Sequence, residues 1–176
     1  SDIGPVIDEP ALAALIRHRA RLEGFGKVIA QTPLPDELKQ RGTFFAPIAC
    51  EIPGLQYLER EVFGPVLHVI RYRAEDIDSV IADINKTGYG LTLGVHTRID
   101  KFARKITGAV RCGNVYVNRS MIGAVVGVQP FGGMGLSGTG PKAGGPHYLA
   151  RFSTEKVIST NTTAAGGNAS LVMMGD

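Results

Sequence analysis

Hydrophobic and polar positions follow two periods along this chain. Apolar side chains three and four residues apart predict helices over residues 10–24, 74–87 and 100–107. Shorter apolar or β-branched runs predict strands at 27–31, 43–52, 66–72, 91–97 and 114–118. Strands and helices therefore alternate through the middle of the chain, which is typical of an α/β fold with an open, parallel-rich sheet and flanking helices. Ligand sites of such sheets lie beyond the carboxyl ends of strands.

A long glycine-rich stretch, residues 118–145, begins at the end of the last of these strands. Ordered connections have a median length of about 4–6 residues, and longer ones usually carry function or are disordered. Apolar residues such as Val125 and Phe131 distinguish this stretch from a flexible Gly/Ser linker. We expect a ligand-binding loop in which bare glycine backbone approaches the ligand beside Phe131. A tightly packed Ω-type loop that binds nothing also fits this composition.

The two ends of the chain carry separate signals. Residues 1–10 have loop chemistry with no element before them, so we expect Ser1 to be an internal point of a longer polypeptide. After a short helical turn at 146–152, residues 153–162 alternate polar and apolar positions, which predicts an exposed strand that pairs with another chain. We therefore expect residues 1–152 to form the main domain, and residues 153–176 an oligomerisation strand and a tail with an apolar tip at 171–174.

Composition and charge exclude several classes of protein. Hydrophobic residues make up 44% and charged residues 20%, as in soluble globular proteins. No apolar run reaches the roughly 18–20 residues of a membrane span, and no signal segment opens the chain, so we expect a cytoplasmic protein. The net charge of +3 gives no electrostatic argument for nucleic acid. The basic run at 17–21, which includes His18, is interpreted as the solvated face of a helix.

Most catalytic motifs are missing from this sequence. Cys50 and Cys112 have no metal spacing and lie in or beside apolar strand-like runs, so we expect buried structural thiols rather than nucleophiles. The four histidines show no ligand spacing, and no metal site is expected. No dinucleotide fingerprint, nucleophile elbow or disulfide framework occurs.

A carboxylate and an aromatic ring stand together in the run REVFGPV, just before the strand at 66–72. Glu61 could accept hydrogen bonds from sugar hydroxyls, and Phe63 could stack on a flat ring. The same two residues fit a solvated turn glutamate and a core phenylalanine. Their chemistry taken alone favours this simpler interpretation.

Four motifs give a family resemblance. EVFGPV at 61–66, YGL at 89–91, NVYVN at 114–118 and PFGG at 130–133 have the order and spacing of the C-terminal part of the aldehyde dehydrogenase superfamily, which the chain resembles. The strings GAVVGVQPFGG and SGTGPKAGGPHYL are similar to the L-glutamate γ-semialdehyde (Δ1-pyrroline-5-carboxylate) dehydrogenase module of bacterial bifunctional proline-catabolic flavoenzymes, the proline utilization A family. The resemblance runs from about residue 2 to at least residue 163.

The resemblance implies NAD-dependent oxidation of the aldehyde through a thiohemiacetal, hydride transfer to nicotinamide, and hydrolysis of a thioester to L-glutamate. Glu61 matches the family glutamate that binds the nicotinamide-ribose hydroxyls, and Phe63 matches the phenylalanine near the nicotinamide. Gly123 and Ala124 match the loop whose backbone N–H groups hold the substrate carboxylate. Phe131 matches the aromatic that packs on the aliphatic stem of the substrate. Bonds from N–H groups to a carboxylate are among the stronger hydrogen bonds.

The resemblance also places the nucleophilic cysteine, the general-base glutamate, the oxyanion asparagine and the Rossmann domain upstream of these motifs. Cys50 and Cys112 do not match the nucleophile, and covalent catalysis needs an activated thiolate. We therefore expect the isolated chain to be inactive and to hold no catalytic residue. It would work with the rest of a parent polypeptide, with NAD, and with FAD if a proline dehydrogenase module is present. We expect a homo-oligomer and no nucleic acid bound by this segment.

Two other functions fit the sequence. A stand-alone binding or assembly module would use the strand at 153–162 and the apolar tip for association only. A dehydrogenase for another carboxylated aldehyde, such as succinate semialdehyde, would be expected to use a cationic side chain near the loop. Arg119 and Lys142 leave that alternative open.

Overall fold

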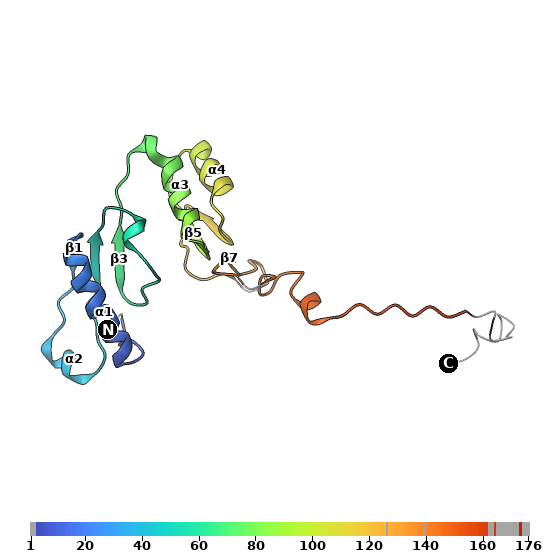
Figure 1. Cartoon of the computed structure of the whole chain (residues 1–176), viewed down its shortest axis with the longest axis horizontal. Helices are drawn as coiled ribbons and strands as arrows, with labels where there is room; N and C mark the ends of the chain where they lie inside the picture. The colour runs from blue at the N-terminus through green and yellow to red at the C-terminus, as the bar shows by residue number, and fades with distance from the viewer. Residues whose placement is uncertain (1–2, 126, 139, 162–163, 165–172, 174–176) are drawn as a thin grey trace. The chain divides into compact units, whose positions relative to one another are not determined.

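The computed structural model describes residues 3–125, 127–138, 140–161, 164 and 173. Figure 1 shows that these residues form a mixed α/β fold. Two compact units are present: unit 1 is built from the described residues of Ser1–Ile122 and Gly133–Thr139, and unit 2 from those of Gly123–Gly132 and Gly140–Asp176. The domain boundary expected after residue 152 stays a prediction.

Helix α1 (Glu9–Glu23) begins at a side-chain cap, because Asp8 accepts a hydrogen bond from the Ala11 N–H at 2.8 Å. Leu15, His18 and Leu22 form its buried face. The prediction of a wholly solvated basic face is therefore wrong for His18. This residue follows Leu15 by three positions and precedes Leu22 by four, so the helical period turns all three side chains the same way.

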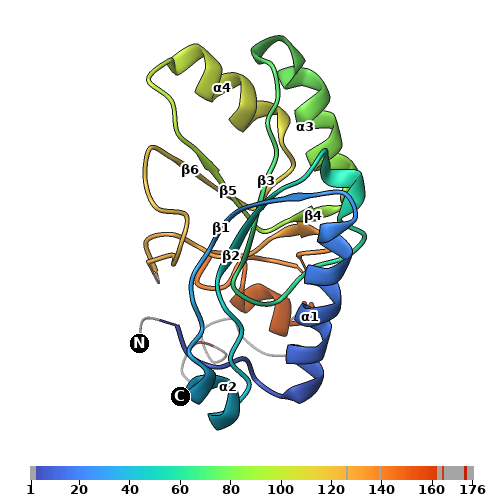
Figure 2. The same ribbon diagram turned by 90° about the vertical axis from the view of Figure 1, so that its left-hand side faces the viewer.

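A three-stranded sheet faces α1 in unit 1 (Figure 2). Its strands are β1 (Lys27–Gln31), β2 (Ile48–Glu51) and β3 (Val66–Val69), in the order β1-β2-β3. β1 is antiparallel to β2, and β2 is parallel to β3. Leu22 of α1 joins Cys50 and Ile52 in one buried cluster. Burial of these apolar side chains holds the helix on the sheet.

A second helix-and-sheet assembly of unit 1 is built on the parallel pair β5 (Thr92–Val95) and β6 (Asn114–Val117). Helix α4 (Asp100–Ala109) is the crossover between these strands, and α3 (Ile77–Lys86) follows the short 3₁₀ helix η2 (Ala74–Asp76). Figures 1 and 2 show α3 and α4 side by side. Their inward side chains and those of the strand region make an apolar cluster: Ile77, Ile81, Val95, Ile106, Val110 and Cys112.

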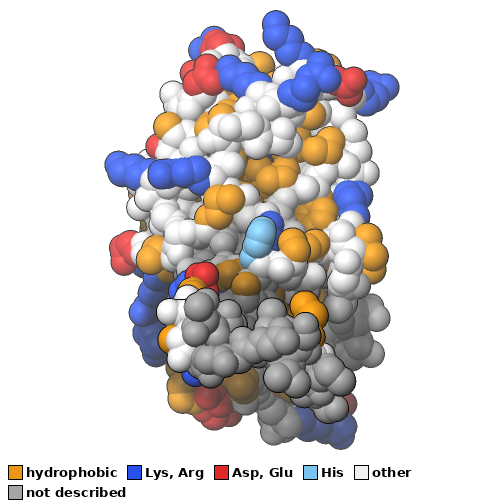
Figure 3. All heavy atoms as spheres, turned by 90° about the vertical axis from the view of Figure 1, so that its right-hand side faces the viewer, with side chains coloured by type: hydrophobic (Ala, Val, Ile, Leu, Met, Phe, Trp, Pro, Cys, Tyr) orange, Lys and Arg blue, Asp and Glu red, His pale blue; other side chains and the backbone are white. Residues whose placement is uncertain are grey.

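Short elements complete the fold. β4 (Tyr89–Gly90) pairs antiparallel with β7 (Met134–Gly135). The remaining helical turns are α2 (Asp36–Arg41), η1 (Leu55–Tyr57) and η3 (Leu149–Phe152). On the face drawn in Figure 3, acidic and basic side chains both occur and hydrophobic side chains lie among them. No helix within the described ranges is long and apolar enough to cross a bilayer.

Two predictions differ from the structure, and a third stays untested. The expected open sheet is not continuous in the described residues, because its short strands fall into three separate sheets. The excursion at 32–42 contains the exposed helix α2, which was not predicted. Residues 153–161 are exposed and carry no assigned strand, so the oligomerisation strand stays a prediction. Residue 162 and positions 171, 172 and 174 of the expected apolar tip lie outside the described residues.

Candidate cofactor and substrate sites

The turn that carries Glu61 and Phe63 is seated on helix α1. Gly64 has φ +153°, and a Cβ built there would lie 2.5 Å from Cδ1 of Leu15, which is 1% exposed. A larger residue would therefore separate the turn from the helix. Glu61 is exposed, and the Phe63 side chain is 77% exposed, so Phe63 is not a core residue within this chain. Both side chains are accessible to a ligand.

Glu61 lines a cavity of about 700 Å³ in unit 1. Polar groups on its wall include Lys86, Thr87, Tyr89 and Ser137, while Phe63 does not line it. A carboxylate that can accept hydrogen bonds on the wall of a partly apolar cavity fits the hydroxyls of a sugar. A second cavity, of about 800 Å³, lies between α1 and the segment that follows β1. None of the candidate site residues lines that second cavity.

The anchor loop, defined here as residues 123–132, belongs to unit 2. Gly123 has φ +73°, a backbone conformation that L residues rarely adopt. Farther along, the Gln129 N–H donates to the Val125 carbonyl at 2.8 Å, and the Gln129 Oε1 accepts from the Val125 N–H at 3.3 Å. Within the described part of the chain, the N–H groups of Gly123 and Ala124 donate to no protein acceptor. Two neighbouring backbone donors therefore remain for a ligand or solvent.

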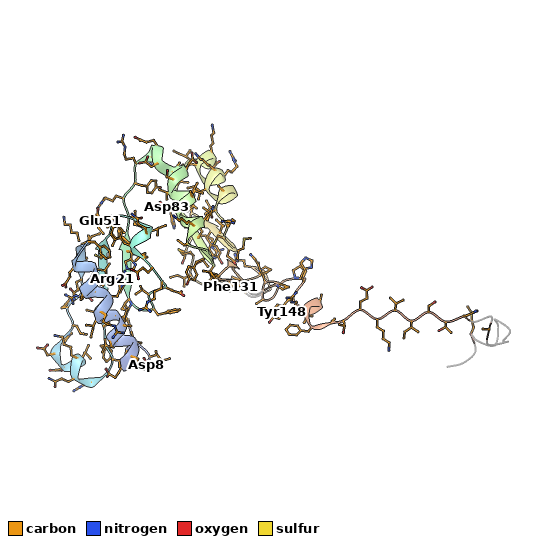
Figure 4. All side chains as sticks on the ribbon, in the orientation of Figure 1. Asp8, Arg21, Glu51, Asp83, Phe131 and Tyr148 are labelled. Atoms are coloured by element: carbon orange, nitrogen blue, oxygen red, sulfur yellow. The ribbon has the colours of Figure 1, made fainter. Side chains whose placement is uncertain are left out.

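Phe131 is fixed by its backbone. Its N–H donates to the Ala143 carbonyl at 3.0 Å, and the Ala143 N–H donates back to the Phe131 carbonyl at 2.9 Å. The adjacent Gly132 permits this close pairing, because a Cβ there would lie 3.2 Å from Cγ of Lys142. Figure 4 labels Phe131 and Tyr148, both in unit 2. The Phe131 side chain is 37% exposed, so part of its ring is open to contact.

The candidate residues thus divide between the two units. Glu61 and Phe63 lie in unit 1, whereas Gly123, Ala124 and Phe131 lie in unit 2. Each group is consistent with the role that the family resemblance implies for it. The assignment of these five residues stays a proposal.

Both cysteines are buried, as the sequence predicts. Cys50 is fully buried and Cys112 is 8% exposed. Burial raises the pKa of the Cys50 thiol, which disfavours the thiolate. Neither cysteine has the exposed, activated environment of a nucleophile. Among the described residues, no three metal-ligating side chains come together.

The two cations considered for another carboxylated aldehyde differ in their surroundings. The guanidinium carbon of Arg119 lies 5.0 Å from the centre of the Tyr116 ring, a cation–π contact. Tyr116 is buried, so this contact draws Arg119 toward β6. Lys142 follows the anchor loop in unit 2. Neither observation supports a cationic carboxylate site.

Sequence reasoning missed three polar side chains that hold this region. Gln129 closes the turn inside the anchor loop, Ser137 accepts a hydrogen bond from the Gly90 N–H at 3.1 Å, and Asn118 binds the backbone of Thr97. Gln129 and Ser137 have no local signal, because their partners depend on the folded chain. Asn118 has one: asparagine is enriched at positive φ, which often marks the end of a strand.

Comparisons with known proteins identify a family for this chain. The model of the aldehyde dehydrogenase family matches residues 1–158. The chain is 54% identical over 153 residues to the bifunctional protein PutA of Rhizobium meliloti, which covers 87% of this chain and 12% of that protein. It is 37% identical over 161 residues to a 1-pyrroline-5-carboxylate dehydrogenase of Bacillus cereus, covering 90% of this chain and 30% of that protein.

Solved structures show the same relationship. A mutant of Bradyrhizobium japonicum proline utilization A superposes with a TM-score of 0.85 at 55% identity, over 92% of this chain and 16% of that one. The 1-pyrroline-5-carboxylate dehydrogenase from Thermus with bound NAD gives a TM-score of 0.75 at 36% identity, over 86% of this chain and 29% of that one. The chain therefore spans only a small part of the length of these relatives. Its sequence and fold show that it belongs to the aldehyde dehydrogenase family.

Proposed function

We propose that this chain is a segment of an NAD-dependent dehydrogenase that oxidises L-glutamate γ-semialdehyde, formed from Δ1-pyrroline-5-carboxylate, to L-glutamate in proline catabolism. One observation carries the proposal. In a chain of the aldehyde dehydrogenase family, Gly123 and Ala124 present two N–H groups that no acceptor in the described residues occupies. Two such donors suit a carboxylate, which this aldehyde carries at the end remote from the reacting carbonyl. Similarity to proteins named 1-pyrroline-5-carboxylate dehydrogenase supports this choice of substrate.

The residues of this chain bind and orient the substrate and NAD. Gly123 and Ala124 hold the substrate carboxylate, and the exposed part of the Phe131 ring packs on the aliphatic stem. Glu61 accepts hydrogen bonds from the nicotinamide-ribose hydroxyls, and Phe63 packs near the nicotinamide. NAD, when bound, supplies the hydride acceptor. Holding both reactants in register reduces the entropic part of the barrier.

The covalent steps need groups from outside this chain. Cys50 and Cys112 are buried and supply no nucleophile. The segment therefore works with the rest of a longer cytoplasmic polypeptide, which also binds FAD if a proline dehydrogenase module accompanies it. The stand-alone assembly module and the succinate-semialdehyde enzyme remain alternatives, but no feature of the described residues favours either.

The test of the proposal is an Ala124→Pro substitution in the full-length protein encoded by the gene that contains this segment. Proline removes one N–H donor from the carboxylate site. Loss of one charge-assisted bond costs about 1.5–3 kcal/mol, or roughly tenfold to more than a hundredfold in kcat/KM. We expect that loss for L-glutamate γ-semialdehyde, measured as NADH formation, and little change for an uncharged aldehyde of similar length.

Two controls accompany this measurement. The isolated chain of 176 residues, assayed in parallel, should form no NADH because it lacks a nucleophile. Equal losses for both aldehydes would mean that the substitution had disordered the loop, and the carboxylate assignment would fail. A wild-type protein without activity on L-glutamate γ-semialdehyde would refute the proposed function itself.

We further propose that residues 153–162 pair with a neighbouring subunit. The described part of this run is exposed and carries no assigned strand, and its apolar side chains, Val157 and Ile158, are 81% and 76% exposed. An extended segment gains backbone hydrogen bonds by adding to a sheet edge. Deleting residues from Ser153 onward should lower the oligomeric mass measured by light scattering. An unchanged mass would show that the segment does not mediate assembly.

A further inference from the structure

Asn118 is the residue at which the chain leaves strand β6. It follows Val117, the last residue of the strand, and precedes Gly123 of the anchor loop by five positions. Its φ of +55° is the only positive φ of a non-glycine residue among those described. Asparagine tolerates this left-handed conformation better than most side chains. The backbone therefore changes direction at Asn118.

The Asn118 side chain replaces the peptide group that would have continued the strand. Its Oδ1 accepts a hydrogen bond from the Thr97 N–H at 2.9 Å, and its Nδ2 donates to the Thr97 carbonyl at 2.8 Å. The Asn118 backbone N–H donates to the Val95 carbonyl at 2.8 Å, as the next rung of the parallel ladder. Thr97 is thus fully paired although β6 has ended. The amide lets the chain turn away without leaving a backbone group of its neighbour unpaired.

The chain that follows the anchor loop is held within unit 1. β7 pairs with β4, the Leu136 N–H donates to the Gly88 carbonyl at 2.9 Å, and the Gly90 N–H donates to Ser137 Oγ. The chain is therefore held by hydrogen bonds both before and after the anchor loop. Between Asn118 and Gly123 only four residues intervene. Asn118 consequently sets the direction in which the chain enters the four residues that lead to Gly123 and Ala124.

We infer that Asn118 is a positioning residue for substrate recognition: its two hydrogen bonds to Thr97 orient the chain that carries the carboxylate-binding N–H groups. This inference rests on the proposed function. Asn118 itself touches no substrate and acts only through the anchor loop. Its effect should fall on the binding of a charged substrate, because charge-assisted bonds depend on close donor–acceptor geometry.

The chain contains a matched control. Asn85, near the end of α3, makes the same pair of contacts: its Nδ2 donates to the Ala109 carbonyl at 2.9 Å, and its Oδ1 accepts from the Arg111 N–H at 2.8 Å. This amide clamps the connection from α4 to β6 and not the anchor loop. Asn85→Asp and Asn118→Asp each keep the acceptor oxygen and place a second oxygen against a backbone carbonyl. The two substitutions therefore impose the same local cost at different places.

The experiment compares Asn118→Asp, Asn118→Gly and Asn85→Asp in the full-length protein. Glycine at 118 keeps the left-handed conformation accessible and removes both side-chain hydrogen bonds. For both Asn118 variants we expect KM for L-glutamate γ-semialdehyde to rise and kcat/KM to fall about tenfold, the change that about 1.4 kcal/mol of lost binding produces. KM for NAD and the kinetics of an uncharged aldehyde of similar length should stay within about twofold of wild type.

The outcomes separate the explanations. Asn85→Asp should lower the thermal midpoint as Asn118→Asp does, yet leave the preference for the charged aldehyde unchanged. Equal losses for both aldehydes in the Asn118 variants, or the same selective loss in Asn85→Asp, would overturn the inference. An active wild-type enzyme with either of these results would leave the proposed function standing. An inactive wild-type enzyme would instead refute the proposed function.

Discussion

The two helix-and-sheet assemblies of unit 1 are built alike but filled differently. In the first, α1 lies on β1, β2 and β3, and its interface includes a polar pair: Nε2 of His18 and Nε2 of His68 are 2.8 Å apart. In the second, α3 and α4 enclose a cluster of aliphatic side chains and Cys112, with no ionisable imidazole among them. Burial lowers the pKa of both rings, and the charge of Arg21, one helical turn after His18, lowers it further.

This difference predicts that the two assemblies respond to different variables. The stability of a buried apolar cluster depends on the volume of its side chains and little on pH. The stability of a pair of facing imidazoles falls when both rings are protonated, because two like charges in a partly buried site repel each other. We therefore expect the stability of the α1 assembly to fall in acid and that of the α3/α4 assembly to change little.

The largest expected effect comes from shortening one core side chain in each assembly. Ile81→Ala should destabilise the α3/α4 assembly, and Leu22→Ala the α1 assembly, each by about 2–5 kcal/mol, because both side chains are buried and the cavity does not fully collapse. Hydrogen exchange of peptides from the two assemblies in the full-length protein measures each loss separately. If either substitution speeds exchange equally in both assemblies, they form one cooperative core and the comparison fails.

A smaller effect is expected from acid. Burial, followed by the charge of His68 and then of Arg21, lowers the pKa of His18. Burial, followed by Arg21, lowers the pKa of His68. The unfolded chain therefore binds protons more readily than the folded one, so stability rises with pH in this window. The contribution is complete above the ordinary histidine value near 6.5 and is lost as the pH falls below it toward the depressed values.

The measurement is hydrogen exchange of α1 and of α3 peptides at several pH values below and above 6.5, after correction for the intrinsic pH dependence of exchange. Protection of α1 should fall on the acid side, whereas α3, which contains no histidine, should change little. The double variant His18→Gln/His68→Gln provides the control, because two glutamines can pair with each other without titrating. A pH dependence of α1 that survives in this variant would show that the histidine pair is not its source.

Local patterns predicted most of the regular elements. β1 occupies the residues expected from KVIAQ, and α3 ends at Lys86, just before the turn that Gly88 makes at φ +76°. The strand expected at 43–52 is shorter, because Pro47 has no N–H and pairing begins at Ile48. β7 was missed because a strand of two residues has no readable period. Its pairing with β4 depends on a contact over more than forty positions.

The candidate site was only partly accessible to sequence reasoning. The glycine-rich composition predicted a loop whose bare backbone approaches a ligand, and within this loop Gly123 and Gly127 have positive φ. The family motif, not the residue chemistry, selected Glu61 and Phe63, since their types alone favoured a surface turn and a core ring. His18 was placed on the wrong side of its helix because the charge of its neighbours outweighed the helical period. Asn118 has a local signal for its backbone angle, but the partners of the Asn118 and Ser137 side chains required the folded backbone, because each binds a peptide group distant in sequence.

The burial of both thiols has a practical consequence for reagents that alkylate cysteine. Cys50 and Cys112 are shielded from solvent by the core, and such reagents react with exposed thiolates. In a native full-length protein, this segment would therefore add almost no background to a labelling experiment. The stoichiometry of rapid modification would count reactive cysteines elsewhere in the polypeptide, and late incorporation at Cys50 would report opening of the α1 assembly.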